Sequence, residues 1–243
     1  MLSPLRLAAI AAILCTVAAT ALWSGGFTPF VGKTPALPIA SAFDASEDFQ
    51  FDPPAPGSYV LHRLKPAPDG RVLDIRGKPH SLADMTRGRI SLVSFVYLSC
   101  GDINGCPLAM ATLFDIHDTS IKVPGLRDEV QLITISFDPE RDTVEAIDAF
   151  AYPVTIDPSS DKKIEWQVLT TAGQADLQPI LDGYGQVVDR SPDQEKISHL
   201  LRIFLVDRDG QIRNIYGLGL IDPRLLMTDV ETLLMEDMDK GAS

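Results

Sequence analysis

Two of the three cysteines of this chain, Cys100 and Cys106, lie in the stretch YLSCGDINGCPLA, with five residues between them and a proline after the second. Four of these five residues are of types that favour turns, so the segment can fold back and bring the two sulfur atoms together. Such a pair of thiols is compatible with a structural disulfide, a redox-active couple or part of a metal site. The cysteines alone leave these three interpretations open.

A third candidate ligand, His199, precedes the apolar segment LLRIFLV, which is typical of a strand. Cys100 follows the strand predicted at 90–98, and Cys106 begins the helix predicted at 107–117, where the helix N-terminus is expected to lower its thiol pKa. If the strand after His199 runs antiparallel to 90–98, all three side chains meet at one edge of the sheet. Two thiolates and one imidazole suit Cu(I), and they would also bind Zn(II) with one open position.

The other histidines and the C-terminal methionines are expected to have structural roles. We expect a strand surface, a loop and an exposed helix position for His62, His80 and His117, respectively, and helix packing for Met227, Met235 and Met238. The run from Asp138 to Asp142 is expected to form a turn and a helix cap. As a hypothesis, Asp138 orients a metal ligand by a hydrogen bond.

The central elements must position the cysteines. The runs at 90–98 and 129–137 are rich in β-branched residues and predict two buried parallel strands, joined by a right-handed crossover through the helix at 107–117. A helix at 143–152, capped by Asp142 and Glu145, is expected to end before Pro153. Residues 163–185 are expected to be a partly helical insertion interrupted by Pro179.

Elements at both ends of the domain complete the prediction. Residues 59–64 and 71–75 are expected to pair as an N-terminal β-hairpin, and 200–217 to form a second hairpin with Asp209 and Gly210 in its turn. A final helix is expected at 222–238, with Asp222 as its N-cap. The order βαβ, α, ββα is that of a thioredoxin-like α/β domain, with a central mixed sheet flanked by helices.

The N-terminal residues 1–24 contain an uncharged apolar run after Arg6, which predicts either a transmembrane anchor or a cleaved signal. Both alternatives send the remainder across the membrane, into an oxidising compartment where paired thiols tend to form disulfides. Residues 25–57 are rich in Pro, Gly, Ser and Ala and are expected to be a linker to a folded domain at 58–240. The formal net charge of −12 disfavours binding to nucleic acids and to anionic lipid surfaces.

Three segments together resemble the Sco/SenC family of membrane-tethered, thioredoxin-like copper proteins that assist cytochrome c oxidase assembly. They are VSFVYLSC with GCPL, TISFDPERDT, and ISHLLRIFLVDRDGQIRNIYG, and the resemblance covers about residues 58–238. It implies that Cys100, Cys106 and His199 bind one copper ion, Cu(I) or Cu(II). The family usually places three residues between its cysteines, so the five found here indicate a divergent member.

The expected function is that of a copper chaperone, tethered on the periplasmic side of a bacterial inner membrane or secreted to the periplasm after signal cleavage. Its partner is then an oxidase subunit or another copper protein that receives the metal. An alternative is a thiol-disulfide oxidoreductase that uses Cys100 and Cys106 as a redox-active pair on a client copper protein. This alternative is disfavoured because thioredoxin-type enzymes carry a proline before the hairpin strand, where this chain has EKISHLL. A third alternative is a non-catalytic protein with a purely structural disulfide.

Overall fold

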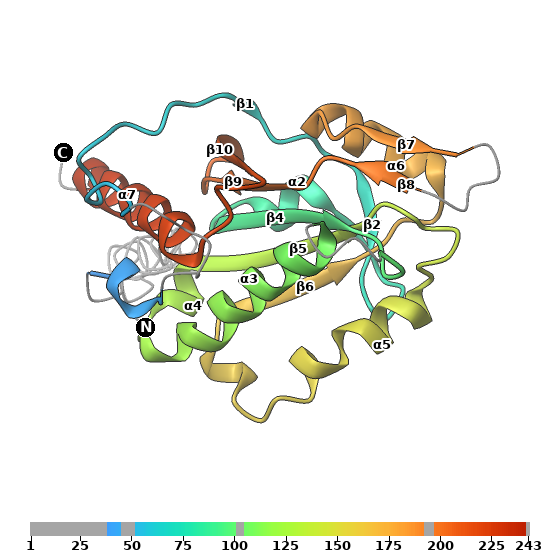
Figure 1. Cartoon of the computed structure of the whole chain (residues 1–243), viewed down its shortest axis with the longest axis horizontal. Helices are drawn as coiled ribbons and strands as arrows, with labels where there is room; N and C mark the ends of the chain where they lie inside the picture. Colours follow the sequence, from blue (N-terminus) through green and yellow to red (C-terminus); the bar gives the residue numbers. More distant parts are fainter. Residues whose placement is uncertain (1–37, 45–51, 101–104, 192–196, 242–243) are drawn as a thin grey trace, which may run out of the picture. The chain divides into compact units, whose positions relative to one another are not determined.

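The computed structural model describes residues 38–44, 52–100, 105–191 and 197–241, all within the second of two compact units, 1–32 and 33–243. Its centre is a six-stranded sheet of order β1-β10-β9-β4-β5-β6 (Figure 1). Strands β4, β5 and β6 are parallel, whereas β9 runs antiparallel to β4. The strands are β1 (Lys65–Pro66), β4 (Ile90–Val96), β5 (Val130–Ser136), β6 (Glu165–Leu169), β9 (Arg202–Val206) and β10 (Gln211–Gly217).

The core lies on both faces of β4 and β5, in which every residue is buried. On one face, Phe114 of α3 (Cys106–Thr119) packs against Trp166 of β6, with ring centroids 4.8 Å apart. On the other face, Tyr184 of α6 (Gln174–Tyr184) packs against Phe95 at 5.2 Å. Because successive side chains of a strand point to opposite faces, the buried and mainly apolar residues of β4 and β5 supply both layers. The predicted mixed sheet flanked by helices is confirmed.

Further elements surround this sheet (Figure 1). Two small antiparallel sheets pair β2 with β3 and β7 with β8. The remaining elements are β2 (Arg71–Leu73), β3 (Pro79–Ser81), β7 (Val188–Arg190), β8 (Ile197–His199), α2 (Leu82–Thr86), α4 (Leu126–Glu129), α5 (Val144–Thr155), α7 (Pro223–Gly241), and the 3-10 helices η1 (Ala40–Ala42), η2 (Ser120–Lys122) and η3 (Ser160–Lys162).

The C-terminal hairpin and helix are confirmed. Strands β9 and β10 pair antiparallel, and Gly210 takes a positive φ of 75° in their turn, which favours glycine. The Asp222 carboxylate accepts a hydrogen bond of 2.9 Å from the amide of Arg224 and therefore caps α7 as expected. Pro223 opens the helix, where its missing N–H has no cost.

The predicted N-terminal hairpin has different strands. Residues 71–73 do form a strand, but it pairs with β3 at 79–81 and not with residues 59–64. The Asp74 carboxylate accepts hydrogen bonds from the amides of Arg76 and Lys78, and Gly77 adopts a positive φ of 73°. Because this turn is short, it brings residues 79–81 directly beside residues 71–73, and these two segments pair. The earlier segment instead leads into β1, which pairs with β10 at the sheet edge.

The helix after β5 differs from its prediction at both ends. Thr143, not Asp142, is the N-cap, because the Asp142 carboxylate is buried and bonded elsewhere. The helix also continues through Pro153 to Thr155, so Pro153 removes only one hydrogen bond in the last turn, where buried Val154 holds the chain to the core.

The segment predicted as an interrupted insertion contains two regular elements. Its first part is β6, which extends the parallel sheet beside β5. Its second part is the continuous helix α6, which includes Pro179. The apolar residues of α6, Leu177, Ile180 and Leu181, are almost fully buried. Packing of this face outweighs the local cost of the proline.

Part of the predicted linker packs against α7. Ile39 and Phe43 are buried, and the Glu231 carboxylate accepts hydrogen bonds of 2.8 and 3.0 Å from the amides of Ile39 and Ala40. The anchor or signal predicted at 1–24 lies outside the described residues. Among the residues that the structure describes, no helix has the length and apolar character needed to cross a bilayer. The domain boundaries at 24, 57 and 240 stay predictions.

Four side chains outside the candidate site lie elsewhere than expected. His62 is exposed, but it lies in an irregular segment before β1 and not in a strand. His117 is buried against Trp166, with ring centroids 5.7 Å apart, although an exposed helix position was predicted. His80 lies in strand β3, where its Nε2 atom is 2.8 Å from the Asp74 carboxylate. Met227 is buried as expected, whereas Met238 is exposed and does not pack in the core. The spacing of apolar residues along a helix does not show which other parts of the fold will bury a given side chain.

We predict that His117 makes stability fall as the solution becomes acidic. Burial lowers the pKa of His117, and the nearby Lys163 ammonium adds to this shift, while Asp118 opposes it. The folded state therefore favours neutral His117, so the unfolded chain binds more protons as pH falls below about 6.5. The variant His117→Phe is expected to lose less stability than wild type between pH 7.5 and 5.5. Thermal unfolding across this range checks it, and parallel curves for both proteins would contradict it.

Candidate metal centre

The candidate site lies at the edge of the sheet where β4 and β5 end. The two strands end side by side: Val96 and Ser136 are their last paired residues, and the amide of Phe137 donates a hydrogen bond of 2.9 Å to the carbonyl of Val96. Strand β9 runs antiparallel to β4, so its first residue, Arg202, lies at this same edge. Cys100 follows β4, and His199 ends β8, just before β9. The predicted meeting of these segments is confirmed.

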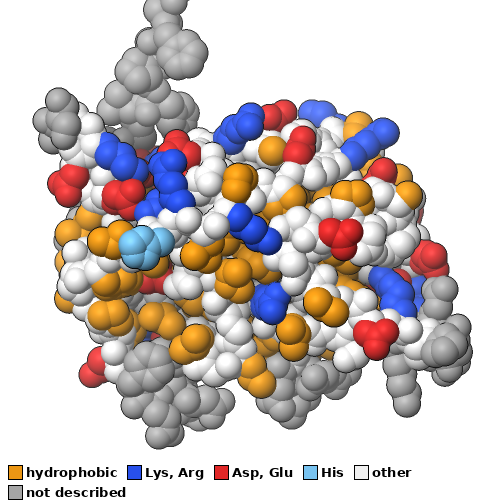
Figure 2. Space-filling model, turned by 90° about the horizontal axis from the view of Figure 1, so that it is seen from above, with side chains coloured by type: hydrophobic (Ala, Val, Ile, Leu, Met, Phe, Trp, Pro, Cys, Tyr) orange, Lys and Arg blue, Asp and Glu red, His pale blue; other side chains and the backbone are white. Residues whose placement is uncertain are grey.

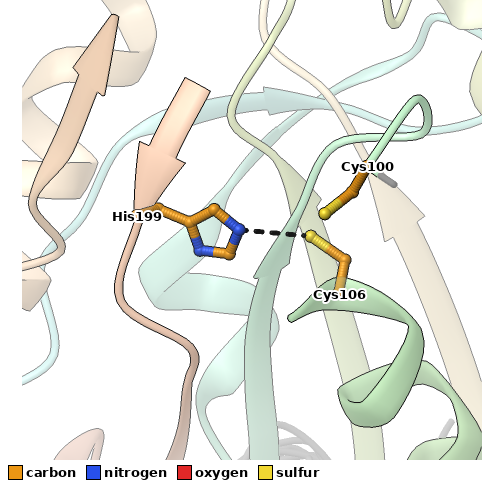
Figure 3. Close-up of side chains that lie close together, drawn as sticks. All are labelled: Cys100, Cys106 and His199. Atoms are coloured by element: carbon orange, nitrogen blue, oxygen red, sulfur yellow. Dashed lines mark hydrogen bonds between the residues drawn. The ribbon is translucent and has the colours of Figure 1, made fainter. Parts of the chain in front are cut away.

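Cys100, Cys106 and His199 point toward one another from the loop after β4, the start of α3 and the end of β8, respectively (Figure 3). Their candidate ligand atoms, two Sγ atoms and one imidazole nitrogen, all lie within 4.8 Å of one another. The Sγ atom of Cys106 is 3.4 Å from Nε2 of His199. Cys106 is buried, Cys100 and His199 are half-buried, and both cysteines are free thiols. Two soft sulfur donors and one imidazole form a donor set that fits copper.

The turn before Cys100 is fixed by a buried carboxylate. The amide of Cys100 donates a hydrogen bond of 3.2 Å to the carbonyl of Tyr97. The Asp142 carboxylate accepts hydrogen bonds from the amide of Leu98 at 3.1 Å and from the Ser136 hydroxyl at 2.6 Å. Burial raises the pKa of Asp142, while these two hydrogen bonds oppose that shift. Asp142 thus connects the ends of both central strands to the cysteine loop.

Replacing Asp142 with alanine is expected to loosen this turn. The change leaves the Leu98 amide and the Ser136 hydroxyl without their acceptor, which costs about 1–3 kcal/mol for a buried donor. The measurement is hydrogen exchange at the Leu98 amide, together with the rate of alkylation of Cys100 by iodoacetamide, and both should increase. The control variant Asp142→Asn keeps an acceptor oxygen and should change both less. Equal rates in wild type and Asp142→Ala would exclude this role.

His199 is supported by a short hairpin and two aromatic rings. In the hairpin, Val188 of β7 is the partner of His199 in β8. The imidazole lies against the ring of Phe137 with centroids 4.7 Å apart, and its edge-on contact with Tyr97 has a centroid distance of 6.0 Å. Both rings follow the central strands directly, so the imidazole rests on the rigid edge of the sheet.

The thiol of Cys106 does not have the low pKa predicted from its place at the helix start. Cys106 is the first residue of α3, but only 3% of it is exposed. Burial raises its pKa above the ordinary value, and the neighbouring Cys100 raises it further. Loss of solvation outweighs the helix dipole here. A metal ion that binds this sulfur must therefore displace a proton.

The hypothesis that Asp138 orients a metal ligand stays a prediction. The buried carboxylate of Asp138 pairs with Arg141 at 2.9 Å and with Arg190 at 3.4 Å. The supporting rings of Tyr97 and Phe137 were missed in the sequence, although both lie within segments that carried the family resemblance.

Comparison with known proteins identifies the family. The SCO1/SenC family pattern matches residues 69–235, which is more than half of the chain. The chain belongs to the SCO1/SenC family. It is 27% identical to the SCO1 protein homolog of Bacillus subtilis over 144 residues, which cover 58% of this chain and 68% of that protein. It is 30% identical to the mitochondrial protein SCO2 homolog of Homo sapiens over 153 residues. These residues cover 61% of this chain and 53% of that relative.

Solved SCO1/SenC structures share the fold. BsSco, a member of the Sco family of cytochrome c oxidase assembly proteins, aligns with a TM-score of 0.56 and 23% identity over 72% of this chain and 98% of its own. A SCO1/SenC family lipoprotein from Bacillus anthracis aligns with a TM-score of 0.55 and 20% identity, over 74% of this chain and 96% of its own. Yeast Sco1, solved with copper bound, aligns with a TM-score of 0.50 and 18% identity. This alignment covers 74% of this chain and 90% of that structure's chain. These likenesses establish the thioredoxin-like fold of the SCO1/SenC family.

Proposed function

We propose that this chain is a copper chaperone that holds one copper ion through Cys100, Cys106 and His199 and assists metallation of a respiratory oxidase copper centre. The observation that carries the proposal is the convergence of two thiols and one imidazole within 4.8 Å. Its support is membership of the SCO1/SenC family together with the copper bound by yeast Sco1 and the oxidase-assembly role of the family that contains BsSco.

The surroundings of the site suit transfer of an ion to another protein. Cys106 is shielded from solvent, while Cys100 and His199 are half-buried and remain accessible. Leu200, next to His199, is 54% exposed, and Val187, beside the partner strand of the hairpin, is 64% exposed. Hydrophobic side chains are scattered among polar and charged ones on the face shown in Figure 2, so the accessibility of Cys100 and His199, rather than an apolar patch, favours approach of a partner to this site. The receiving partner is therefore expected to approach from the His199 side and exchange ligands there.

We also propose that the domain is tethered to the periplasmic side of a bacterial inner membrane, or secreted to the periplasm after signal cleavage. The support is the uncharged apolar run after Arg6, followed by a segment rich in proline and glycine. Fractionation of cells that produce the full chain, with protease treatment of intact spheroplasts, tests this. Full protection of the domain from the protease would contradict it.

Copper binding by the full chain tests the main proposal. The purified protein, reduced without oxygen, is titrated with Cu(I) in competition with a coloured Cu(I) chelator. We expect one tightly bound ion in wild type, and a large loss of affinity in Cys100→Ser and in Cys106→Ser. The copper-loaded protein is then mixed with a metal-free oxidase copper domain, to which the ion should pass. Absence of a tight equivalent in wild type would refute the proposal.

The alternative, a thiol-disulfide oxidoreductase, is favoured by one observation, the closeness of two free thiols. In that function the half-buried Cys100 would attack the client disulfide, and the buried Cys106 would resolve the mixed disulfide. Reduction of insulin by the dithiol protein distinguishes the two functions. A rate comparable to that of thioredoxin, with no retained copper, would favour the oxidoreductase.

A further inference from the structure

Arg190 ties the hairpin that carries His199 to the end of β5. Its guanidinium donates hydrogen bonds to the carbonyl of Phe137 and, at 3.4 Å, to the carboxylate of Asp138. A third contact, also of 3.4 Å, reaches the side-chain oxygen of Gln174 on α6. Arg190 is the last residue of β7 and pairs with Ile197 of β8. One side chain thus joins the small hairpin, the central sheet and a helix.

Two paths lead from Arg190 to the imidazole of His199. Through the hairpin, Arg190 holds β7, in which Val188 is the partner of His199. Through the sheet, it holds the backbone of Phe137, whose ring packs against the imidazole at 4.7 Å. The same hydrogen bond therefore fixes both the strand that bears the ligand and the ring that supports it.

The fold is expected to tolerate loss of this arginine. Asp138 is only 3% exposed, but Arg141 pairs with it at 2.9 Å, which is closer than the contact of Arg190. Removal of Arg190 therefore does not leave a buried carboxylate without a cationic partner, which is the change that strongly destabilises proteins. The expected effect is local and concerns the position of His199.

We propose that Arg190 is a positioning residue that fixes the imidazole of His199 relative to the sulfur of Cys106 and thereby sets the affinity of the site for copper. The inference rests on the proposed copper function. Residues that orient a metal ligand through a second interaction typically change affinity by about 10–100-fold when they are replaced. A loose imidazole reduces affinity because part of its ordering must then accompany binding.

The test compares Arg190→Met with Arg141→Met, a matched change of the other arginine that pairs with Asp138. We expect Arg190→Met to lower Cu(I) affinity about 10-fold or more, whereas Arg141→Met should change it little. In a His199→Ala background, Arg190→Met should cause no further loss, because the ligand through which it acts is absent. The metal-free full chain gives an independent readout: hydrogen exchange at 197–199 should accelerate and the His199 imidazole NMR signals should shift.

Equal losses in the presence and absence of His199 would overturn the inference and show a general structural effect. Unchanged exchange at 197–199 and unchanged affinity in Arg190→Met would overturn it too. Failure of the proposed function has a different signature, since wild type itself would then retain no copper. The exchange and NMR measurements on the metal-free chain would still decide whether Arg190 positions the imidazole.

Discussion

Replacing His199 with alanine is expected to lower the affinity for Cu(I) by more than about 100-fold, because loss of a direct ligand should exceed the effect of losing a residue that only orients one. Cys100 and Cys106 then remain as two sulfur donors without the nitrogen donor that lies 3.4 Å from the sulfur of Cys106. The change removes a half-buried side chain at the end of a three-residue strand, so the sheet should stay intact.

The measurement is Cu(I) competition against a coloured chelator, with absorption spectra of the Cu(II) form as a second readout. His62→Ala is the matched control, because His62 is exposed and lies outside the candidate site. The disulfide between Cys100 and Cys106 should still form in His199→Ala under mild oxidation. If His199→Ala bound copper as tightly as wild type, the site would consist of the cysteines and some other ligand.

Replacing Arg213 with methionine is expected to destabilise the domain by about 3–5 kcal/mol, the usual cost of removing one member of a buried charge cluster. The guanidinium pairs with Asp207 at 2.8 Å and with Glu236 of α7 at 2.6 Å, and its Nε atom donates to the carbonyl of Leu61 at 3.0 Å. Only 3% of its side chain is exposed. The change would leave Asp207 and Glu236 without this partner and weaken the attachment of α7 to β10.

Urea unfolding followed by tryptophan fluorescence gives the free energy of unfolding for wild type and Arg213→Met. The control is Arg63→Met, which removes an ion pair of similar length, 2.6 Å to Asp209, between side chains that are 52% and 63% exposed. This exposed pair should contribute less than about 1 kcal/mol. Similar losses in both variants would show that burial of the Arg213 cluster does not govern its contribution.

The parts of the fold that could be predicted are those with a strong local signal. Strands β4 and β5 are fully buried segments rich in β-branched and other apolar residues, and the turn at Gly210 has the residue types of a hairpin. Strand β6 was missed because its five residues mix exposed and buried positions and lie next to a helix with an internal proline. The hairpin of β7 and β8 has strands of three residues, too short to show a period.

The three candidate ligands could be predicted from the sequence, whereas the residues that hold them in place could not. Cys100, Cys106 and His199 follow from the edge of the sheet where their segments meet, and from the family resemblance. The role of Asp142 was missed because a carboxylate before a helix also fits a cap, and only the tertiary structure shows it bonded to Leu98. No sequence pattern indicated a role for Arg190, because its contacts are with Phe137 and Asp138, which are more than fifty positions away in the chain.

The wide spacing of the three candidate ligands along the chain sets an order of events. Cys106 and His199 are 93 positions apart, and His199 reaches the site only when β7, β8 and β9 have assembled on the sheet. A chain that has not yet folded can offer at most the two cysteines. The complete donor set therefore exists only after folding, so metal loading should follow maturation of the domain and should in turn stabilise it.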